Sequence, residues 1–210
     1  MMNDEAMDMM PEESTNLLSA DRINPTALGE DAIAHYPTEF LNTLNLSGLP
    51  PHRLTLKKGC PLILIRNINL KKGLCNGTRL KLINISDNKR VLTVKVLNGT
   101  HINTIAYIPR IDISPSETDF PIPFQRRQFP VKIAFALTIN RAQGQSFNRT
   151  AIYLPQPVFA HGQFYVFLGR SADPNSTKIK VDDIPGVQGR FPHKEGIYTR
   201  NIVYHEALTL

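Results

Sequence analysis

The first fifty residues show scattered apolar positions with three short segments of regular pattern. Residues 1–10 combine acidic residues with four methionines at apolar positions, which favours one short helix ending before Pro11. Residues 16–21 have the pattern of a strand. Residues 37–44 have the pattern of a short helix, with Pro37 in its first turn. These elements are too short to define a fold alone.

After residue 50 the pattern changes to short apolar or alternating runs separated by turn residues. Strands are predicted for residues 61–66, 78–86, 91–97 and 101–108. Tight turns between them are indicated by Asn76-Gly77, by Asp87-Asn88-Lys89 and by Asn98-Gly99. Several short strands joined by tight turns predict a small antiparallel barrel, a module that closes most of its own edges.

Residues 114–130 contain four prolines and are expected to form an extended connector, which carries Arg126 and Arg127. Beyond this segment the pattern becomes α/β. Its predicted elements are a strand at 131–137, a short helix near 142, a strand at 150–154, a helix at 162–168 and a strand at 178–181. The tail from 185 is rich in Pro and Gly and is expected to be loosely ordered until residues 201–208.

Charge is distributed unevenly along the chain. Residues 1–50 hold one basic and nine acidic residues, a net of −8, whereas residues 51–210 hold 23 basic and nine acidic residues, a net of +14. A surface that faces phosphates is therefore expected after residue 50, where Lys and Arg can displace condensed counterions. Ordinary solubilising charge is the alternative.

Cys60 and Cys75 lie in apolar surroundings and form no metal-ligand pattern, so no metal site is expected. Free thiols in a reducing compartment are predicted, with a Cys60–Cys75 disulfide as the alternative. No run of about 18 apolar residues occurs, so no membrane span is expected. The acidic N-terminus lacks the layout of a signal peptide. A nuclear protein is expected, with a mitochondrial or cytoplasmic one as the alternative.

An apolar run at residues 132–137 breaks abruptly into the polar sequence Thr-Ile-Asn-Arg-Ala-Gln-Gly-Gln-Ser at residues 138–146. Polar side chains after the end of a buried strand are how α/β domains present donors to a ligand in the crevice beyond the strand. Gly144 would let the backbone come close to a phosphate or ribose. An ordinary polar turn between a strand and a helix is the alternative.

A second apolar run, Tyr-Val-Phe-Leu at residues 165–168, is followed by Gly169 and a single arginine, Arg170. An arginine here can be a cation that interacts favourably with the C-terminal end of a helix. It can equally be placed to contact a charged ligand. The residues alone leave both interpretations open.

Together these two runs resemble the last two signature motifs of Pif-family DNA helicases, especially the helicases of Helitron-type mobile elements. The family pattern Thr-[Ile/Val]-[Asn/His]-Lys-[Ser/Ala]-Gln-Gly-Gln-[Ser/Thr] matches residues 138–146, with Arg141 in place of Lys. The family pattern His-Gly-Gln-x-Tyr-Val-Ala-Leu-Ser-Arg matches residues 161–170, with Phe167 in place of a small residue and Gly169 in place of Ser. Phe167 is expected to crowd the helix contact, and Gly169 to loosen the backbone at the arginine. Further similarity covers residues 36–42, 48–52, 56–61, 74–79, 108–110, 124–130 and 201–206.

The resemblance implies a role for each matching residue. Single-strand DNA contacts are implied for Thr138, Asn140, Arg141 and Gln143, and a place at the nucleotide edge for Gly144 and Gln145. Arg170 would be the arginine finger that reaches the γ-phosphate, where such a group contributes about 10³–10⁵ in rate. Lysines and an arginine of the predicted barrel are candidates for contacts to the DNA backbone, with a solvated rim as the alternative: Lys57, Lys58, Lys71, Lys72, Arg79 and Lys81.

The fold class implied is α/β, a second RecA-like motor domain of the P-loop NTPase class with an inserted SH3-like antiparallel barrel. Residues 1–54 would be the first part of this domain (2A), 55–129 the insert (2B) and connector, 130–184 the second part of 2A, and 185–210 a C-terminal tail. The implied protein is the C-terminal part of a 5′-to-3′ ATP-dependent DNA helicase that unwinds DNA. Such helicases serve DNA repair, recombination and telomere maintenance.

A helicase motor also needs the phosphate-binding sequence Gly-x-x-x-x-Gly-Lys-[Ser/Thr], and no Gly-Lys-[Ser/Thr] occurs here. In the family this sequence belongs to a first RecA-like domain, which is therefore an expected partner together with single-stranded DNA. ATP and Mg²⁺ are expected in the complete family enzyme and not on this chain alone. The isolated chain is predicted to be inactive as an ATPase. The alternatives are a non-enzymatic single-strand nucleic-acid-binding module and an inert remnant of a truncated helicase.

Overall fold

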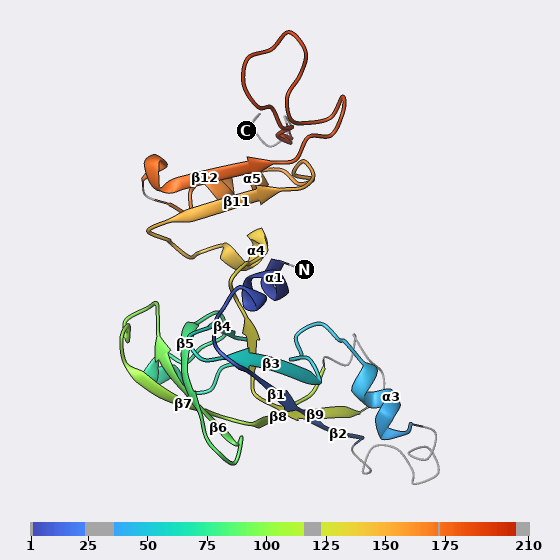
Figure 1. Cartoon of the computed structure of the whole chain (residues 1–210), viewed down its shortest axis with the longest axis vertical. Coiled ribbons are helices and arrows are strands. Elements are labelled where there is room, and N and C mark those ends of the chain that lie inside the picture. Colours follow the sequence, from blue (N-terminus) through green and yellow to red (C-terminus); the bar gives the residue numbers. More distant parts are fainter. Residues whose placement is uncertain (1, 24–35, 116–122, 172, 205–210) are drawn as a thin grey trace. The chain divides into compact units, whose positions relative to one another are not determined.

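The computed structural model describes residues 2–23, 36–115, 123–171 and 173–204. The chain divides into two compact units, Met1–Ala136 and Leu137–Leu210 (Figure 1). Each unit has an apolar cluster of its own, and the larger clusters lie in the first unit.

The centre of the first unit is a five-stranded antiparallel sheet in the order β10-β4-β5-β6-β7. Its strands are β4 (Pro61–Leu64), β5 (Arg79–Ile85), β6 (Val91–Val96), β7 (Ile105–Pro109) and β10 (Val131–Ile133). Alternate residues of β5 and β6 point from one face of the sheet into the core. These buried residues are Leu80, Leu82, Leu92, Val94 and Val96. This alternation is the signal that predicted both strands.

Left-handed backbone at the expected positions joins these strands. Gly77 and Gly99 have φ values of 89° and 82°, and Lys89 has a φ of 54°. Glycine adopts this conformation without steric cost, which explains the two Asn-Gly turns. The predicted hairpins β5–β6 and β6–β7 are thus confirmed. β4 and β5 also pair, but residues 65–78 form a longer connection between them, which ends with the Asn76-Gly77 turn, so no tight turn joins these two strands.

The predicted closed barrel is not found among the described residues. The hydrogen-bonded order runs linearly from β10 to β7, so the sheet is open. Closure would need another strand beside β7, but β3 (Arg53–Lys57) pairs with β1 (Ser14–Leu18) in a separate antiparallel ladder. The observed fold is an α/β chain whose first unit is built from antiparallel sheets.

A three-stranded antiparallel sheet corrects the connector expected at residues 114–130. In this sheet β9 (Phe124–Gln128) lies between β2 (Ala20–Ile23) and β8 (Ile111–Ile113). Side chains alternate along β9, with Phe124, Arg126 and Gln128 buried and Gln125 and Arg127 more exposed. The expectation was wrong because the inward positions of this strand include polar residues, which hid the alternation.

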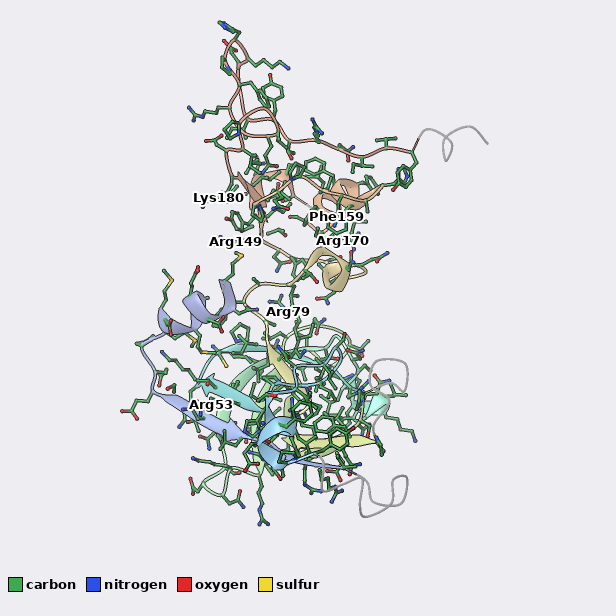
Figure 2. All side chains as sticks on the ribbon, turned by 90° about the vertical axis from the view of Figure 1, so that its right-hand side faces the viewer. Arg53, Arg79, Arg149, Phe159, Arg170 and Lys180 are labelled. Atoms are coloured by element: carbon green, nitrogen blue, oxygen red, sulfur yellow. The ribbon has the colours of Figure 1, made fainter. Side chains whose placement is uncertain are left out.

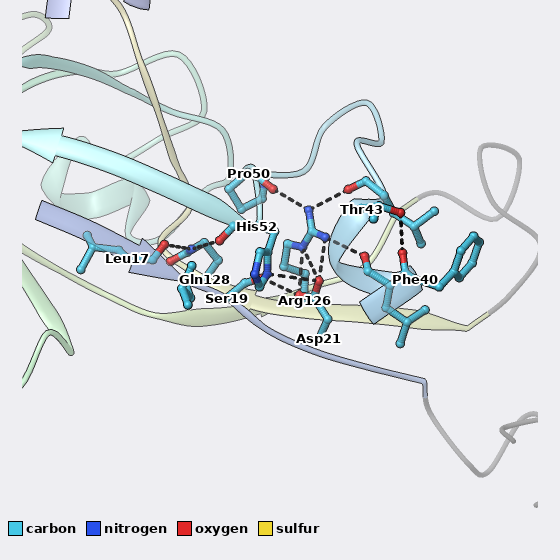
Figure 3. A network of polar contacts seen from close by, with 12 residues as sticks. Leu17, Ser19, Asp21, Phe40, Thr43, Pro50, His52, Arg126 and Gln128 are labelled. Atoms are coloured by element: carbon cyan, nitrogen blue, oxygen red, sulfur yellow. Dashed lines mark hydrogen bonds and ion pairs between the residues drawn. The ribbon is translucent and has the colours of Figure 1, made fainter. Parts of the chain in front are cut away.

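Arg126 is fully buried at the centre of a polar network (Figure 3). Its guanidinium forms an ion pair with Asp21 at 2.7 Å, and both side chains have no solvent exposure. It also donates hydrogen bonds to the carbonyl oxygens of Leu41, Leu44 and Pro50 at 3.0–3.1 Å. Two of these carbonyls belong to the last turn of α3 (Thr38–Thr43) and the residue after it. The arginine therefore attaches the short helix to the three-stranded sheet.

Helical elements of the first unit are short. α1 (Met2–Asp8) contributes one buried residue, Met7, and a 3₁₀ turn, η2 (Leu70–Lys72), follows β4. Both the N-terminal helix and the helix over residues 37–44 were predicted. Pro37 lies at the N-cap of α3, next to the first-turn position expected for it.

The second unit pairs β11 (Thr150–Leu154) with β12 (Thr177–Val181) in a parallel ladder. A parallel pair needs a crossover, and α5 (Gln163–Leu168) and a 3₁₀ turn, η3 (Pro174–Ser176), lie in the connection. α4 (Ile139–Ala142) precedes β11. The buried residues Ile152, Leu154 and Val158 form the apolar cluster, with Phe164, Phe167 and Val181 packed against it.

The tail from residue 185 is more ordered than its composition suggested. Gly189 forms an antiparallel bridge with Tyr198. The buried side chain of Gln188 donates to the carbonyls of Leu154 and Asp182, both at 3.0 Å. These bonds tie the glycine-rich segment to the end of β11.

Both cysteines are free thiols, as predicted. Cys60 is fully buried, and burial raises the pKa of its thiol. No helix in the described ranges is both long and apolar enough to cross a membrane.

Candidate functional site

The polar turn at residues 138–146 contains one turn of helix. Thr138 occupies the N-cap of α4 with extended backbone (φ −68°, ψ 155°) and makes no side-chain cap bond. The side chains of Thr138, Asn140 and Gln143 are exposed. α4 also contains Arg141, whose side chain lies outside what the structure describes. With Ser146, which is also exposed, the turn therefore presents four described polar side chains to solvent.

Gly144 follows this helical turn with a φ of 76°. A Cβ atom at this position would have no other atom within 4 Å. The left-handed backbone explains the glycine, and the open space leaves its peptide accessible to a ligand.

Arg170 makes hydrogen bonds to the polar turn, to the preceding helix and to the residue after the turn. Its Nη1 donates to the carbonyl oxygen of Gln145 at 3.3 Å, and its Nε donates to the carbonyl oxygen of Val166 at 2.8 Å. The backbone N–H of Phe147 donates to the carbonyl oxygen of Arg170 at 2.8 Å, next to a parallel bridge between Phe147 and Ser171. The two sequence motifs thus meet within one compact unit (Figure 2).

Phe147 and Val166 were not singled out from the sequence, yet their backbone groups position the arginine. Their positions in the sequence could have identified them, because Phe147 directly follows the motif at 138–146 and Val166 lies four residues before Arg170. In a helix that spacing brings a side chain next to a carbonyl of the preceding turn.

The two departures from the motif at residues 161–170 are accommodated. Phe167 packs against the apolar cluster of the second unit instead of crowding the helix contact. Gly169 has a φ of −74°, which any residue adopts, and an added Cβ would meet the Tyr165 carbonyl oxygen at an ordinary 3.4 Å. The expected crowding and loosening are therefore not observed.

The four lysines assigned to DNA contacts all lie in the first unit, not with Arg170. Lys58, Lys71 and Lys72 are exposed, the last two in η2. Lys57 is partly buried and donates from Nζ to the carbonyl oxygen of Met10 at 2.8 Å. That bond competes with a phosphate contact, whereas the other three ammonium groups face solvent.

Arg79 and Arg110 show that several cations of the first unit belong to its structure. Burial lowers the pKa of both guanidinium groups, and for Arg110 the nearby charge of Arg127 adds to the effect. Arg110 donates to the carbonyl oxygen of Leu18 at 2.7 Å and lies over the ring of Phe129. These contacts explain why basic residues alone do not mark a ligand surface.

Known proteins that are similar to this chain in sequence and in structure are Pif1 helicases. Residues 39–85 match the family model described as "DNA helicase Pif1, 2B domain". ATP-dependent DNA helicase PIF1 of Xenopus laevis is 29% identical over 141 residues, which cover 67% of this chain and 21% of that protein. The mouse (Mus musculus) protein of the same name is 33% identical over 134 residues, covering 63% of this chain and 20% of that protein.

The chain matches a portion of a Pif1-family helicase.

Solved Pif1 structures share the fold. The Candida albicans Pif1 helicase superposes with a TM-score of 0.63 at 22% identity, covering 84% of this chain and 41% of that chain. Bacteroides Pif1 bound to single-stranded DNA superposes with a TM-score of 0.59 at 21% identity, covering 85% and 37%. The chain spans about a fifth of the length of the curated Pif1 relatives that it matches.

ATP and Mg²⁺ place different demands on the residues of this unit. The open peptide at Gly144, the adjacent Gln145 and the guanidinium of Arg170 fit one edge of a nucleotide. In the described part of the chain no group of three or more His, Cys, Asp or Glu residues could hold a metal ion. The Pif1-like portion therefore fits a phosphate contact from one side and offers no such ligand set for Mg²⁺ among those residues.

Proposed function

We propose that this chain is the C-terminal part of a 5′-to-3′ ATP-dependent DNA helicase. In this proposal it contributes single-strand DNA contacts through Thr138, Asn140, Arg141 and Gln143, and an arginine finger through Arg170. The names of the relatives support the activity, since they are ATP-dependent DNA helicases. One solved Pif1 structure is bound to single-stranded DNA, and another is in complex with ADP-AlF3 and single-stranded DNA. These complexes support single-stranded DNA and a nucleotide as the ligands in this proposal.

One observation carries the proposal: the bond from Arg170 Nη1 to the Gln145 carbonyl oxygen. The turn that would touch DNA and the guanidinium that would touch phosphate are then parts of one hydrogen-bonded assembly. A displacement of the turn by DNA would move the arginine, because the arginine donates a hydrogen bond to a carbonyl oxygen of the turn. Such a link is what a motor needs to couple DNA contacts to the charge on a transferring phosphoryl group.

The proposed division places residues 1–54 and 130–184 in a second RecA-like domain, with an inserted module at 55–129 and a tail at 185–210. Gly144, Gln145 and Arg170 would line the nucleotide from one side. The phosphate-binding loop and the ligands for Mg²⁺ would come from a first RecA-like domain. A nuclear location follows from the proposed work on DNA.

The test is a chimera in which this chain replaces the matching portion of the Xenopus laevis relative. The chimera is expected to hydrolyse ATP in the presence of single-stranded DNA. Arg170→Ala should lower that rate about 10³–10⁵-fold while single-strand affinity stays within about twofold. Arg149→Ala, which changes another arginine of the same unit, is the matched control and should leave hydrolysis unchanged.

Two results would contradict the proposal. In the first, Arg170→Ala hydrolyses ATP as fast as the unchanged chimera, which removes the arginine finger. In the second, Asn140→Ala and Gln143→Ala leave single-strand affinity unchanged, which removes the proposed DNA contacts.

A second candidate function is a non-enzymatic single-strand nucleic-acid-binding module. The observation that favours it is charge: residues 53–110 hold twelve Lys and Arg residues and one acidic residue, Asp87. Filter binding of the isolated chain to oligothymidylate tests it. Binding that weakens steeply with salt supports the module. No binding at low salt identifies an inert remnant.

A further inference from the structure

The outward face of the five-stranded sheet carries cations and an exposed aromatic side chain in two neighbouring cross-strand rows. Cross-strand pairing places Lys81 beside Lys95 and Lys95 beside Ile105. The next outward row places Thr93 beside Tyr107. Residues two apart on a strand point to the same face, so all five share the face opposite the core.

Ile105 and Tyr107 are unusually exposed for apolar side chains on a sheet. Ile105 is 51% exposed and Tyr107 is 67% exposed, while Ile108 of the same strand is fully buried. An uncharged edge strand with exposed apolar side chains invites association with a partner. Selection for solubility alone would favour a charged residue at either position.

Charge on this face has one sign. The five strands of the sheet contain Arg79, Lys81, Lys95 and Lys132 and no Asp or Glu. Neighbouring strands lie about 4.8 Å apart, so Lys81 and Lys95 lie within about two strand spacings of Ile105. The partner that complements this face is therefore an anion with flat apolar groups.

We infer that this face, with Tyr107, Lys95 and Lys81 at its centre, is a second contact surface for single-stranded DNA. Tyr107 would stack on a base, Ile105 would extend the apolar support, and the two lysines would neutralise backbone phosphates. Single-strand binding commonly combines these two elements, since every base has a π-face and every nucleotide a phosphate. The inference rests on the proposed function for its ligand. Lys81 is already a candidate for a backbone contact, whereas Tyr107, Ile105 and Lys95 are residues that the proposed function does not use.

The backbone of β7 argues against an added peptide strand as the occupant. Pro109 ends the strand and has no N–H, which removes one donor from the edge. The cations and the tyrosine also lie on the face of the sheet and not along its edge. A ligand that lies across the strands fits this arrangement better than one that lengthens the sheet.

The experiment measures the affinity of the full chain for a fluorescein-labelled oligothymidylate and for an abasic oligonucleotide of equal length. Tyr107→Ala is expected to weaken binding of the oligothymidylate about five- to one-hundred-fold, the range for loss of one base stack. The same change should leave the abasic probe within about twofold. Tyr107→Phe keeps the π-face and should bind both probes like the unchanged chain.

Two further variants separate charge from stacking. The double change Lys81→Gln and Lys95→Gln should reduce the magnitude of the slope of log K against log salt by about 1.4, or 0.7 for each phosphate. Phe40→Ala is the control for an exposed aromatic residue of the same unit, since Phe40 is 43% exposed and lies on α3. It should change neither affinity nor slope.

Photocrosslinking of the unchanged chain to 5-iododeoxyuridine DNA removes any dependence on folding of the variants. A crosslink on the peptide that contains Tyr107 supports the inference. The inference is overturned by crosslinks confined to residues 138–146, by equal loss of both probes in Tyr107→Ala, or by no binding of the unchanged chain at low salt. It is also overturned if Tyr107→Ala converts a dimer to a monomer at unchanged affinity, which assigns the face to a second copy.

The result also separates the inference from the proposed function. If Tyr107→Ala weakens binding and Asn140→Ala with Gln143→Ala do not, the sheet surface stands and the proposed contacts of the turn fail. If the opposite pattern is found, the turn stands and the sheet surface fails. ATP hydrolysis by the chimera tests the arginine finger independently of both.

Discussion

Arg126 and Asp21 form an ion pair at 2.7 Å in which neither side chain is exposed to solvent. The pair joins two strands that are 105 positions apart in sequence. Removal of one partner leaves an uncompensated charge in the interior, which is strongly destabilising.

Asp21→Asn is therefore expected to lower the free energy of unfolding of the first unit by about 3–5 kcal/mol. Urea denaturation followed by circular dichroism measures this change. Arg22→Gln is the matched control, because Arg22 forms a 3.0 Å ion pair with Asp112 while it is 63% exposed. Its loss should cost at most about 1 kcal/mol, and equal effects of the two changes would contradict the assigned role of the buried pair.

The two cysteines should differ in reactivity. Cys60 is fully buried and burial raises the pKa of its thiol, so little reactive thiolate is present near neutral pH. Cys75 is partly exposed. Labelling with a thiol reagent at pH 7, read by peptide mass spectrometry, should modify Cys75 first. Denaturant should then bring the two rates together, and faster labelling of Cys60 in the folded chain would contradict the buried position.

Gly189→Ala should disrupt the tail. Gly189 has a φ of 105°, and an added Cβ would clash with Asp183 Oδ1 and lie 2.7 Å from Asp183 Cα. The bond from Arg190 N to Asp183 Oδ1 and the bridge to Tyr198 should both be lost. Hydrogen exchange of residues 183–198 is expected to accelerate strongly.

Gly186→Ala is the control for the backbone effect alone. Its φ is 74°, and an added Cβ would have no other atom within 4 Å. This change should cost about 1–2 kcal/mol through strain at positive φ, without a clash. Similar exchange rates in the two variants would show that the contact with Asp183 does not matter.

The isolated chain should show no ATP hydrolysis above background, with or without single-stranded DNA. The sequence has no Gly-Lys-[Ser/Thr], so the amides and the lysine that hold the phosphates are missing. A coupled-enzyme assay on purified chain measures this, with the chimera as the positive control. Steady hydrolysis stimulated by single-stranded DNA would contradict the prediction.

Local patterns predicted much of this structure. The Asn-Gly pair at 98–99 lies in the turn between β6 and β7, the pair at 76–77 forms a turn directly before β5, and the strand expected at 150–154 has those bounds. These signals work because turn geometry and side-chain alternation depend on residues close in sequence. The motif residues Gln145 and Arg170 were also selected from the sequence, and they lie in contact.

Long-range pairing was not predictable in the same way. β9 was assigned to a connector because Arg126 and Gln128 are polar, and only distant partners make their burial favourable. Asp21 and the carbonyl of Leu17 supply those partners. The open edge at β7 was missed for a related reason, since the pattern of a strand does not specify its neighbours.

The position of β9 between β2 and β8 has a consequence for synthesis on the ribosome. β2 emerges about a hundred residues before β9, the strand with which it pairs. β2 must therefore stay without its partner strand until residue 128 has left the exit tunnel, whereas β1 can pair with β3 much earlier. Non-local pairing of this kind slows folding and makes it sensitive to aggregation, so the first unit is most exposed to aggregation during that interval.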